Sequence, residues 1–137
     1  MNKIFLLAAC CLIGACSSGY QPLYYFNEVQ VVNLSEDGIR EVSLRVVDSG
    51  IGLNCEQVAK FAMCHDRFGR KRYPQQGLEL SWTQADGSRG SDNPNPHVPA
   101  YFSPGLALRI VIEIGQDGGV KAFYEQEEPG RGTLFDN

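Results

Sequence analysis

The sequence predicts a small, mainly β domain of the α+β class, an antiparallel sheet or sandwich of about five strands with one helix packed on it. Most apolar residues fall into short alternating or β-branched runs, which are separated by turn sequences rich in glycine and aspartate. Only one segment has apolar residues at helical spacing. The length of 137 residues, of which 43% are hydrophobic and 20% charged, suits a single globular domain.

Two neighbouring runs in the N-terminal half predict a β-hairpin. Tyr24–Leu34 is rich in aromatic and β-branched side chains, which favour strands. Ser35–Gly38 has the residue types of a turn, and Ile39–Val47 then alternates, with apolar residues at every second position from Val42 to Val46. We therefore expect two antiparallel strands joined by this turn.

One helix is expected over Cys55–Asp66. Asn54 is a suitable N-cap residue, and Gln57 occupies the position of a capping box. The apolar face would follow the i, i+3, i+4 rule through Val58, Phe61, Ala62 and His65. We expect the helix to stop near Gly69.

Three further strands are expected in the C-terminal half. Leu78–Thr83 alternates, and Leu106–Ile114 carries aliphatic residues at every second position. Gln116–Gly119 then turns the chain, so that Val120–Gln126 returns as a hairpin partner. Residues 84–105, which contain several prolines and glycines and little periodicity, form a long loop of the kind that is usually functional or disordered.

The N-terminus has the features of a signal peptide. Lys3 is followed by the uncharged apolar run Ile4–Ala15, which is shorter than the roughly 20 residues that a membrane-spanning helix needs. The sequence Ile13-Gly14-Ala15-Cys16 resembles the lipobox of bacterial lipoproteins, an aliphatic residue and two small residues before a cysteine. That resemblance implies cleavage before Cys16 and lipidation of its thiol. Two alternatives remain: Cys10, which would leave a very short apolar run, and an ordinary secretory signal cleaved near Ala15.

These features divide the chain and indicate its location. Residues 1–15 would be the signal peptide, 16–22 a short tether, 23–127 a globular β-rich domain and 128–137 a loose tail. The tether reaches at most about 25 Å, so the domain should lie close to a membrane surface. In a Gram-negative source, Ser17 after the lipidated cysteine implies an outer-membrane anchor facing the periplasm, because an aspartate there tends to retain lipoproteins in the inner membrane.

Cys55 and Cys64 are the thiols left in the mature chain besides Cys16. In an oxidising compartment two such thiols usually pair. On one continuous helix, however, their Cα atoms would be about 13 Å apart, whereas a disulfide needs less than about 7 Å. We therefore expect a disulfide with a shorter helix, and we leave open buried free thiols or a redox pair. Zinc held by cysteines and histidines fits no known spacing, so no metal or other cofactor is expected.

Two surface segments are candidate binding sites. The segment Arg67–Tyr73 is basic in an otherwise acidic protein, through Arg67, Arg70, Lys71 and Arg72. It is either a solvated helix end or a patch for lipid head groups, lipopolysaccharide phosphates or an acidic partner. The proline-rich loop Asn93–Phe102 carries His97, Tyr101 and Phe102, aromatic residues of the kind that anchor interfaces or fill a core.

The sequence therefore predicts a lipid-anchored envelope protein without catalytic activity, an accessory or docking subunit of a larger outer-membrane or secretion-type assembly. The first alternative is a binder of anionic glycolipid or wall polymer through the basic segment. The second is a thiol-dependent enzyme, for which Cys55 or Cys64 would have to be free and His97 brought close. The net charge of −4 and the predicted compartment speak against a nucleic-acid partner.

Overall fold

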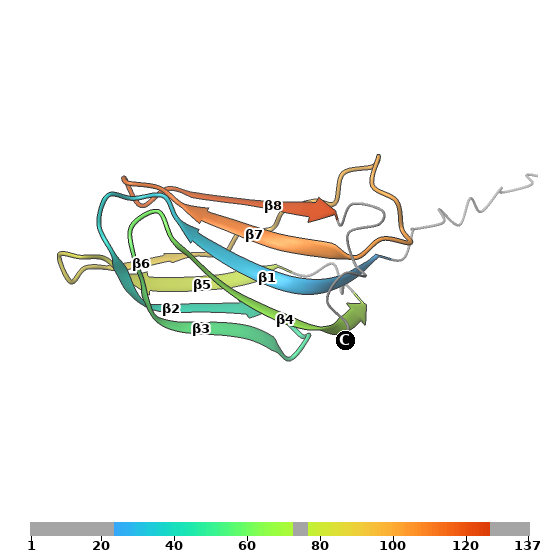
Figure 1. Cartoon of the computed structure of the whole chain (residues 1–137), viewed down its shortest axis with the longest axis horizontal. Helices are drawn as coiled ribbons and strands as arrows, with labels where there is room; N and C mark the ends of the chain where they lie inside the picture. Colours follow the sequence, from blue (N-terminus) through green and yellow to red (C-terminus); the bar gives the residue numbers. More distant parts are fainter. Residues whose placement is uncertain (1–23, 73–76, 127–137) are drawn as a thin grey trace, which may run out of the picture.

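The chain folds as a β-sandwich of two four-stranded sheets in a computed structural model, which describes residues 24–72 and 77–126 (Figure 1). One sheet has the strand order β4-β1-β7-β8 and the other β3-β2-β5-β6. The first sheet contains β1 Tyr25–Asn33, β4 Met63–Arg72, β7 Leu108–Ile114 and β8 Val120–Gln126. The second contains β2 Ile39–Val46, β3 Ile51–Val58, β5 Leu78–Thr83 and β6 Arg89–Asp92. Neighbouring strands are antiparallel except β1 and β7, which run parallel.

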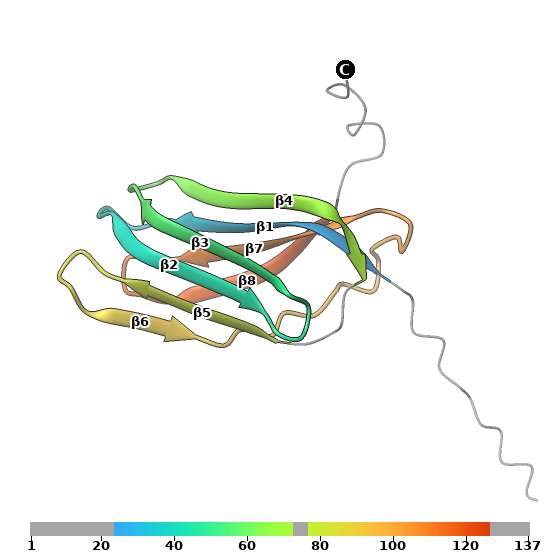
Figure 2. The ribbon, with the colours of Figure 1, turned by 90° about the horizontal axis from the view of Figure 1, so that it is seen from below.

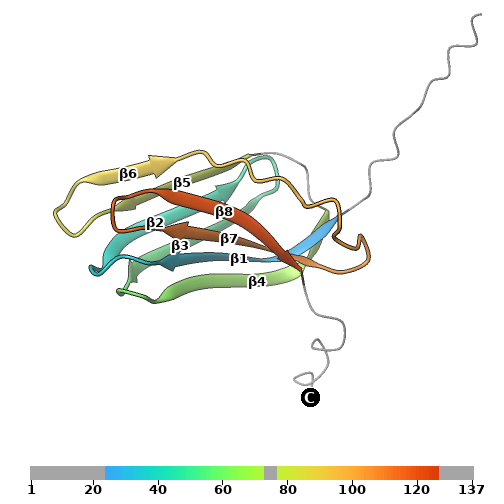
Figure 3. The ribbon, with the colours of Figure 1, turned by 90° about the horizontal axis from the view of Figure 1, so that it is seen from above.

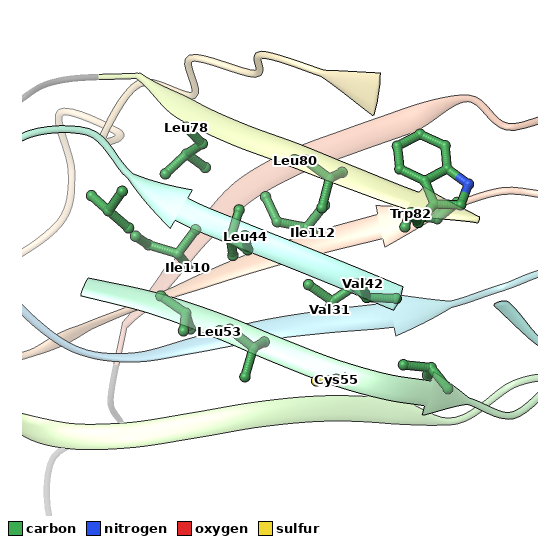
Figure 4. Close-up of a cluster of buried hydrophobic side chains, with 14 of the residues drawn as sticks. Val31, Val42, Leu44, Leu53, Cys55, Leu78, Leu80, Trp82, Ile110 and Ile112 are labelled. Atoms are coloured by element: carbon green, nitrogen blue, oxygen red, sulfur yellow. The ribbon is translucent and has the colours of Figure 1, made fainter. Parts of the chain in front are cut away.

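Aliphatic side chains from the inner faces of the two sheets form one core. Figure 4 shows Leu44 and Leu80 of one sheet facing Ile110, Ile112 and Val31 of the other. These residues are at most 3% exposed, as the alternation of each strand predicts.

A β-bulge in β1 decides which of its residues enter the core. The pairing register of β1 shifts between Phe26 and Glu28 against both β4 and β7. Strict alternation from Phe26 would point Glu28 inward, but the extra residue places Phe26, Val29 and Val31 in the core and turns Glu28 to the outer face. β2 has a similar irregularity between Arg40 and Ser43, where Glu41 has a φ of 50°.

The predicted helix over Cys55–Asp66 is wrong, and the fold is all-β in the described residues. This segment forms the end of β3, a turn at 59–62 and the beginning of β4. Leu53 and Cys55 are buried whereas Asn54 and Glu56 are exposed, which is strand alternation. Phe61, expected on the buried helix face, is 64% exposed at a φ of 55°.

The predicted strands lie close to their expected positions, but one of the two expected hairpins is wrong and some strands were not predicted. The expected hairpin of the first two strands is wrong, because β1 and β2 lie in different sheets, whereas β7 and β8 do pair. The predicted number of strands is also too low, since β3 and β4 replace the helix and the loop 84–105 contains β6. The expected signal peptide, tether and tail lie outside the described residues.

Cys55 and Cys64 form a disulfide that joins the two sheets. Cys55 lies on β3 and Cys64 on β4, with their Cα atoms 6.6 Å apart. On the predicted helix the Cα atoms of the two cysteines would be too far apart for a disulfide. The turn that replaces the helix brings them close enough to bond. The bond therefore fastens the edge strand β4 to the opposite sheet.

The sandwich has two contrasting ends, which we call proximal and distal. The proximal end is where β1 begins and β4 ends, and the segment 93–107 also lies there (Figures 2 and 3). The distal end carries the β1–β2, β3–β4, β5–β6 and β7–β8 connections (Figure 1). Among the described residues, none belongs to a helix that is long and apolar enough to cross a membrane.

Candidate functional site

The basic segment lies on β4, at the edge of its sheet, and runs to the proximal end. Arg72 pairs with Tyr25 and Lys71 with Phe26, so the cations lie beside the first residues of β1. Only Cys64 and Phe68 of β4 are partly buried, and Phe68 makes an edge-to-face contact with Phe26 at 5.2 Å between ring centroids. Arg70, Lys71 and Arg72 are exposed. The solvated helix end considered from the sequence is therefore an exposed edge strand.

Arg67 has a different environment from the other three cations. It contacts Glu28, whose side chain is only 8% exposed on the outer face of the sheet, at 3.3 Å between Nε and Oε2. Arg109 lies on the other side of Glu28 at 3.5 Å and also donates to Glu125 at 2.8 Å. The four residues form one cross-strand row of alternating charge, in the order Arg67, Glu28, Arg109 and Glu125. Arg67 thus compensates a nearly buried carboxylate and, unlike the other three cations, already has an internal carboxylate partner among the described residues.

Arg70, Lys71 and Arg72 have no carboxylate partner among residues 24–72 and 77–126. Within that part of the chain, the cations that do form ion pairs with carboxylates are Arg45, Arg67, Arg89 and Arg109. The remaining exposed cations are Arg40, Lys60, Lys121 and the three consecutive residues of β4. The candidate basic site therefore consists of three residues, Arg70, Lys71 and Arg72, and no longer includes Arg67. We call Arg70–Arg72 the basic strand end.

The loop that carries His97, Tyr101 and Phe102 contains both exposed and anchored aromatics. Tyr101 is 83% exposed, whereas Phe102 is partly buried against the core. The carbonyl of Phe102 accepts a hydrogen bond from the hydroxyl of Tyr24 at 3.4 Å. Ser103 and Gln126 exchange two further bonds through the Gln126 amide group. The loop therefore has a fixed base at the proximal end and presents Tyr101 to solvent.

Among residues 24–72 and 77–126, the cysteines and histidines do not form a reactive cluster. Cys55 and Cys64 are bonded to each other, so neither is a thiolate nucleophile or ligand. His65 contacts Glu28 at 3.2 Å between Nδ1 and Oε1, and His97 is an exposed residue of the proximal loop. Within the described residues, no group of three or more His, Cys, Asp or Glu side chains is placed to hold a metal ion.

The sequence reasoning missed a hollow of about 220 Å³ at the distal end. Its lining includes Ser35, Asp37, Gln84, Asp86 and Gln116, with Ile39, Ile114 and Trp82 as its apolar part. The Asp86 carboxylate accepts bonds from the hydroxyl and the backbone N–H of Ser88, and these bonds lower the pKa of Asp86. Nothing local in the sequence marks this hollow, because its walls come from three separate connections.

Asn33 organises the distal end and was also missed. Its fully buried amide nitrogen donates to the carbonyls of Asp37 at 2.8 Å, Val58 at 3.2 Å and Ala59 at 3.2 Å. Its oxygen accepts from the backbone and hydroxyl groups of Ser35. One side chain thus links the β1–β2 connection to the β3–β4 turn. The clue in the sequence was a polar residue at an inward position of a strand.

Comparisons with known proteins give a distant likeness without functional content. No protein family model matches the chain, and no curated protein matches it. A protein from Eubacterium rectale, solved by NMR, is similar to it with 13% sequence identity, a TM-score of 0.47, and coverage of 80% of this chain and 94% of the other. A similarity this low says nothing about the function of this chain.

Proposed function

We propose that this chain is a lipid-anchored, non-catalytic envelope lipoprotein that acts as an accessory or docking subunit of a larger membrane assembly. The anchor would be Cys16, and the partner would be a protein located at the same membrane surface. The loop with His97, Tyr101 and Phe102 would make the contact.

The observation that carries the docking role is the way in which Tyr101 is held. Tyr101 is 83% exposed, yet the adjacent Phe102 packs partly against the core and its carbonyl group accepts a hydrogen bond from Tyr24. A large aromatic side chain on a fixed base loses little conformational entropy on binding, which favours its use as an interface anchor. Because Tyr24 directly precedes β1, the contact would lie beside the tether and therefore near the membrane.

The lipid anchor is supported by the sequence Ile13-Gly14-Ala15-Cys16 and is tested separately from docking. Cells that express the chain with a C-terminal tag are grown with a labelled fatty acid. We expect the label on the mature protein and its loss in the Cys16→Ser variant. A Cys10→Ser variant is the matched control and should remain labelled. Labelling that persists in Cys16→Ser would contradict the proposed anchor.

The docking role is tested by site-specific photo-crosslinking in the native cell envelope. A photoreactive amino acid at position 101 should capture one defined envelope protein. The matched control places the same group at position 61, where Phe61 is also well exposed but lies in the distal β3–β4 turn. Capture of the same partner from both positions, or of no protein from position 101, would contradict the proposed contact.

A further inference from the structure

The placement of unpaired positive charge distinguishes the two ends of the molecule. Three of the exposed cations without a carboxylate partner in the described residues are consecutive, at Arg70, Lys71 and Arg72. The others are dispersed over three elements: Arg40 is the second residue of β2, Lys60 lies in the β3–β4 turn and Lys121 is the second residue of β8. Positive charge is therefore concentrated at the proximal end and dispersed at the distal end.

The basic strand end lies directly beside the first residues of β1. Arg72 lies opposite Tyr25, the first residue of β1, and Lys71 lies opposite Phe26. If Cys16 is lipidated, the eight Cα–Cα steps from Cys16 to Tyr24 span at most about 29 Å when the chain is fully extended. The short connection confines the proximal end to within about 29 Å of the head groups, so that the cations can reach the layer of roughly 10 Å in which an anionic surface attracts them.

We infer that the basic strand end binds the anionic head groups of the membrane in which the chain is anchored, and so holds the sandwich with its proximal end toward the bilayer. This inference rests on the proposed lipid anchor. It specifies what the anchor alone leaves open, namely the orientation of the domain. The contact would set the height and direction at which Tyr101 meets a membrane-bound partner.

The chemistry of the contact follows from the residues. Arginine forms paired hydrogen bonds to phosphate oxygens, and lysine adds a mobile positive charge. Neither needs to break an internal ion pair, because none is present for these three side chains within the described residues. Each basic residue near an anionic bilayer strengthens binding by about fivefold, so three together should contribute about 100-fold.

Alternatively, these charges serve only to prevent the edge strand from pairing with another molecule. Lysine and arginine on an edge strand discourage pairing with the edge of another molecule. On that account, neutralising Arg70, Lys71 and Arg72 would promote self-association without altering any affinity for lipid. The two accounts therefore predict different results in a vesicle assay.

The test uses a chain that begins at Ser17, which contains all eight described strands because these lie within 25–126, and circular dichroism first checks that it is folded. Its partitioning is measured on vesicles containing 30% phosphatidylglycerol and on vesicles of phosphatidylcholine alone. We expect binding only to the anionic vesicles, and a loss of about 100-fold in the R70Q/K71Q/R72Q variant. The matched control, R40Q/K60Q/K121Q, changes the net charge equally at dispersed positions and should lose less than about fivefold.

The outcomes distinguish binding to lipid head groups from binding to free phosphate, and they are independent of the test of the proposed function. Equal losses in the two triple variants would show a net-charge effect and overturn the inference, as would no binding to anionic vesicles. Inorganic phosphate at millimolar concentration should not compete, and full competition would reassign the site to a soluble phosphate. Lipidation of Cys16 is not measured in this assay, so a failure here leaves the fatty-acid labelling result standing, and the reverse also holds.

Discussion

The two ends of the sandwich differ in the contacts that particular side chains make. At the distal end, Asn33 links two connections through buried hydrogen bonds, and the disulfide of Cys55 and Cys64 lies on the neighbouring parts of β3 and β4. At the proximal end, Arg70, Lys71 and Arg72 have no internal carboxylate partner within residues 24–72 and 77–126, and Tyr101 is exposed. The comparison indicates that the distal end contributes mainly to stability, while the proximal end is available for external contacts.

The largest expected effect comes from changing the buried amide at the distal end. Asn33→Asp would direct a carboxylate oxygen at the carbonyl groups of Val58 and Ala59, which Nδ2 of Asn33 now contacts as a donor. We expect the free energy of unfolding to fall by about 3 kcal/mol or more at neutral pH. Urea unfolding followed by the fluorescence of Trp82, the one tryptophan of the chain, measures this change.

The matched control for this change is Asn54→Asp, an exposed position on β3. It should alter the free energy of unfolding by less than about 0.5 kcal/mol. Equal effects at the two positions would mean that the Asn33 network contributes nothing specific to the distal end.

Removing the disulfide is expected to have the next largest effect. The C55A/C64A double variant opens a small covalent loop between β3 and β4 and should lose about 2–3 kcal/mol of stability. A reductant should destabilise the unmodified protein by a similar amount and leave the double variant unchanged. A reductant that has no effect on the unmodified protein would contradict the bond between the sheets.

A smaller loss is expected at the contact between Trp82 and β6. A Cβ atom at Gly90 would lie 2.2 Å from Cε2 of the Trp82 ring, so Gly90→Ala must displace the indole or β6. We expect a cost of about 1–3 kcal/mol and a red shift of the Trp82 emission. Gly69→Ala is the control, because a Cβ atom there meets no atom within 4 Å, and it should leave the emission unchanged. A Gly90→Ala protein with unaltered emission and stability would refute this packing.

The smallest expected effect on stability is at the proximal end. The R70Q/K71Q/R72Q variant should unfold within about 0.5 kcal/mol of the unmodified protein, because the side chains are exposed and make no ion pair in the described part of the chain. Differential scanning calorimetry checks this. A loss above about 1.5 kcal/mol would assign these residues a structural role and remove the contrast between the two ends.

The limits of the sequence reasoning have particular physical causes. Regular alternation located β5 at its actual bounds, and the expected hairpin with the preceding strand located β8. The bulge between Phe26 and Glu28 could not be seen in the sequence, and strict alternation from Phe26 would have placed Glu28 in the core although it lies on the outer face. The false helix arose because Val58, Phe61 and Ala62 mimic helical spacing across a turn in which Phe61 points to solvent.

Long-range pairing was beyond the reach of local patterns. The parallel pairing of β1 with β7 joins residues about 80 positions apart, and no local signal specifies it. For the same reason the basic segment was recognised from composition, while the pairing of Arg67 with Glu28 required the register of β4 on β1. The positive charge of this segment was predictable from the sequence. The sequence did not show that Arg67 pairs with an internal carboxylate while the other three cations do not within the described residues.

The orientation of the anchored protein on an anionic bilayer is the most direct test of the contrast between the ends. An environment-sensitive fluorescent amino acid replaces Tyr101 at the proximal end or Phe61 at the distal end, two aromatic residues that are both well exposed. Quenching by head-group nitroxide lipids is then measured with the lipidated full-length protein in vesicles containing phosphatidylglycerol. We predict strong quenching at position 101 and little at position 61, with the difference reduced by R70Q/K71Q/R72Q. Equal quenching at both positions, or stronger quenching at position 61, would contradict the account.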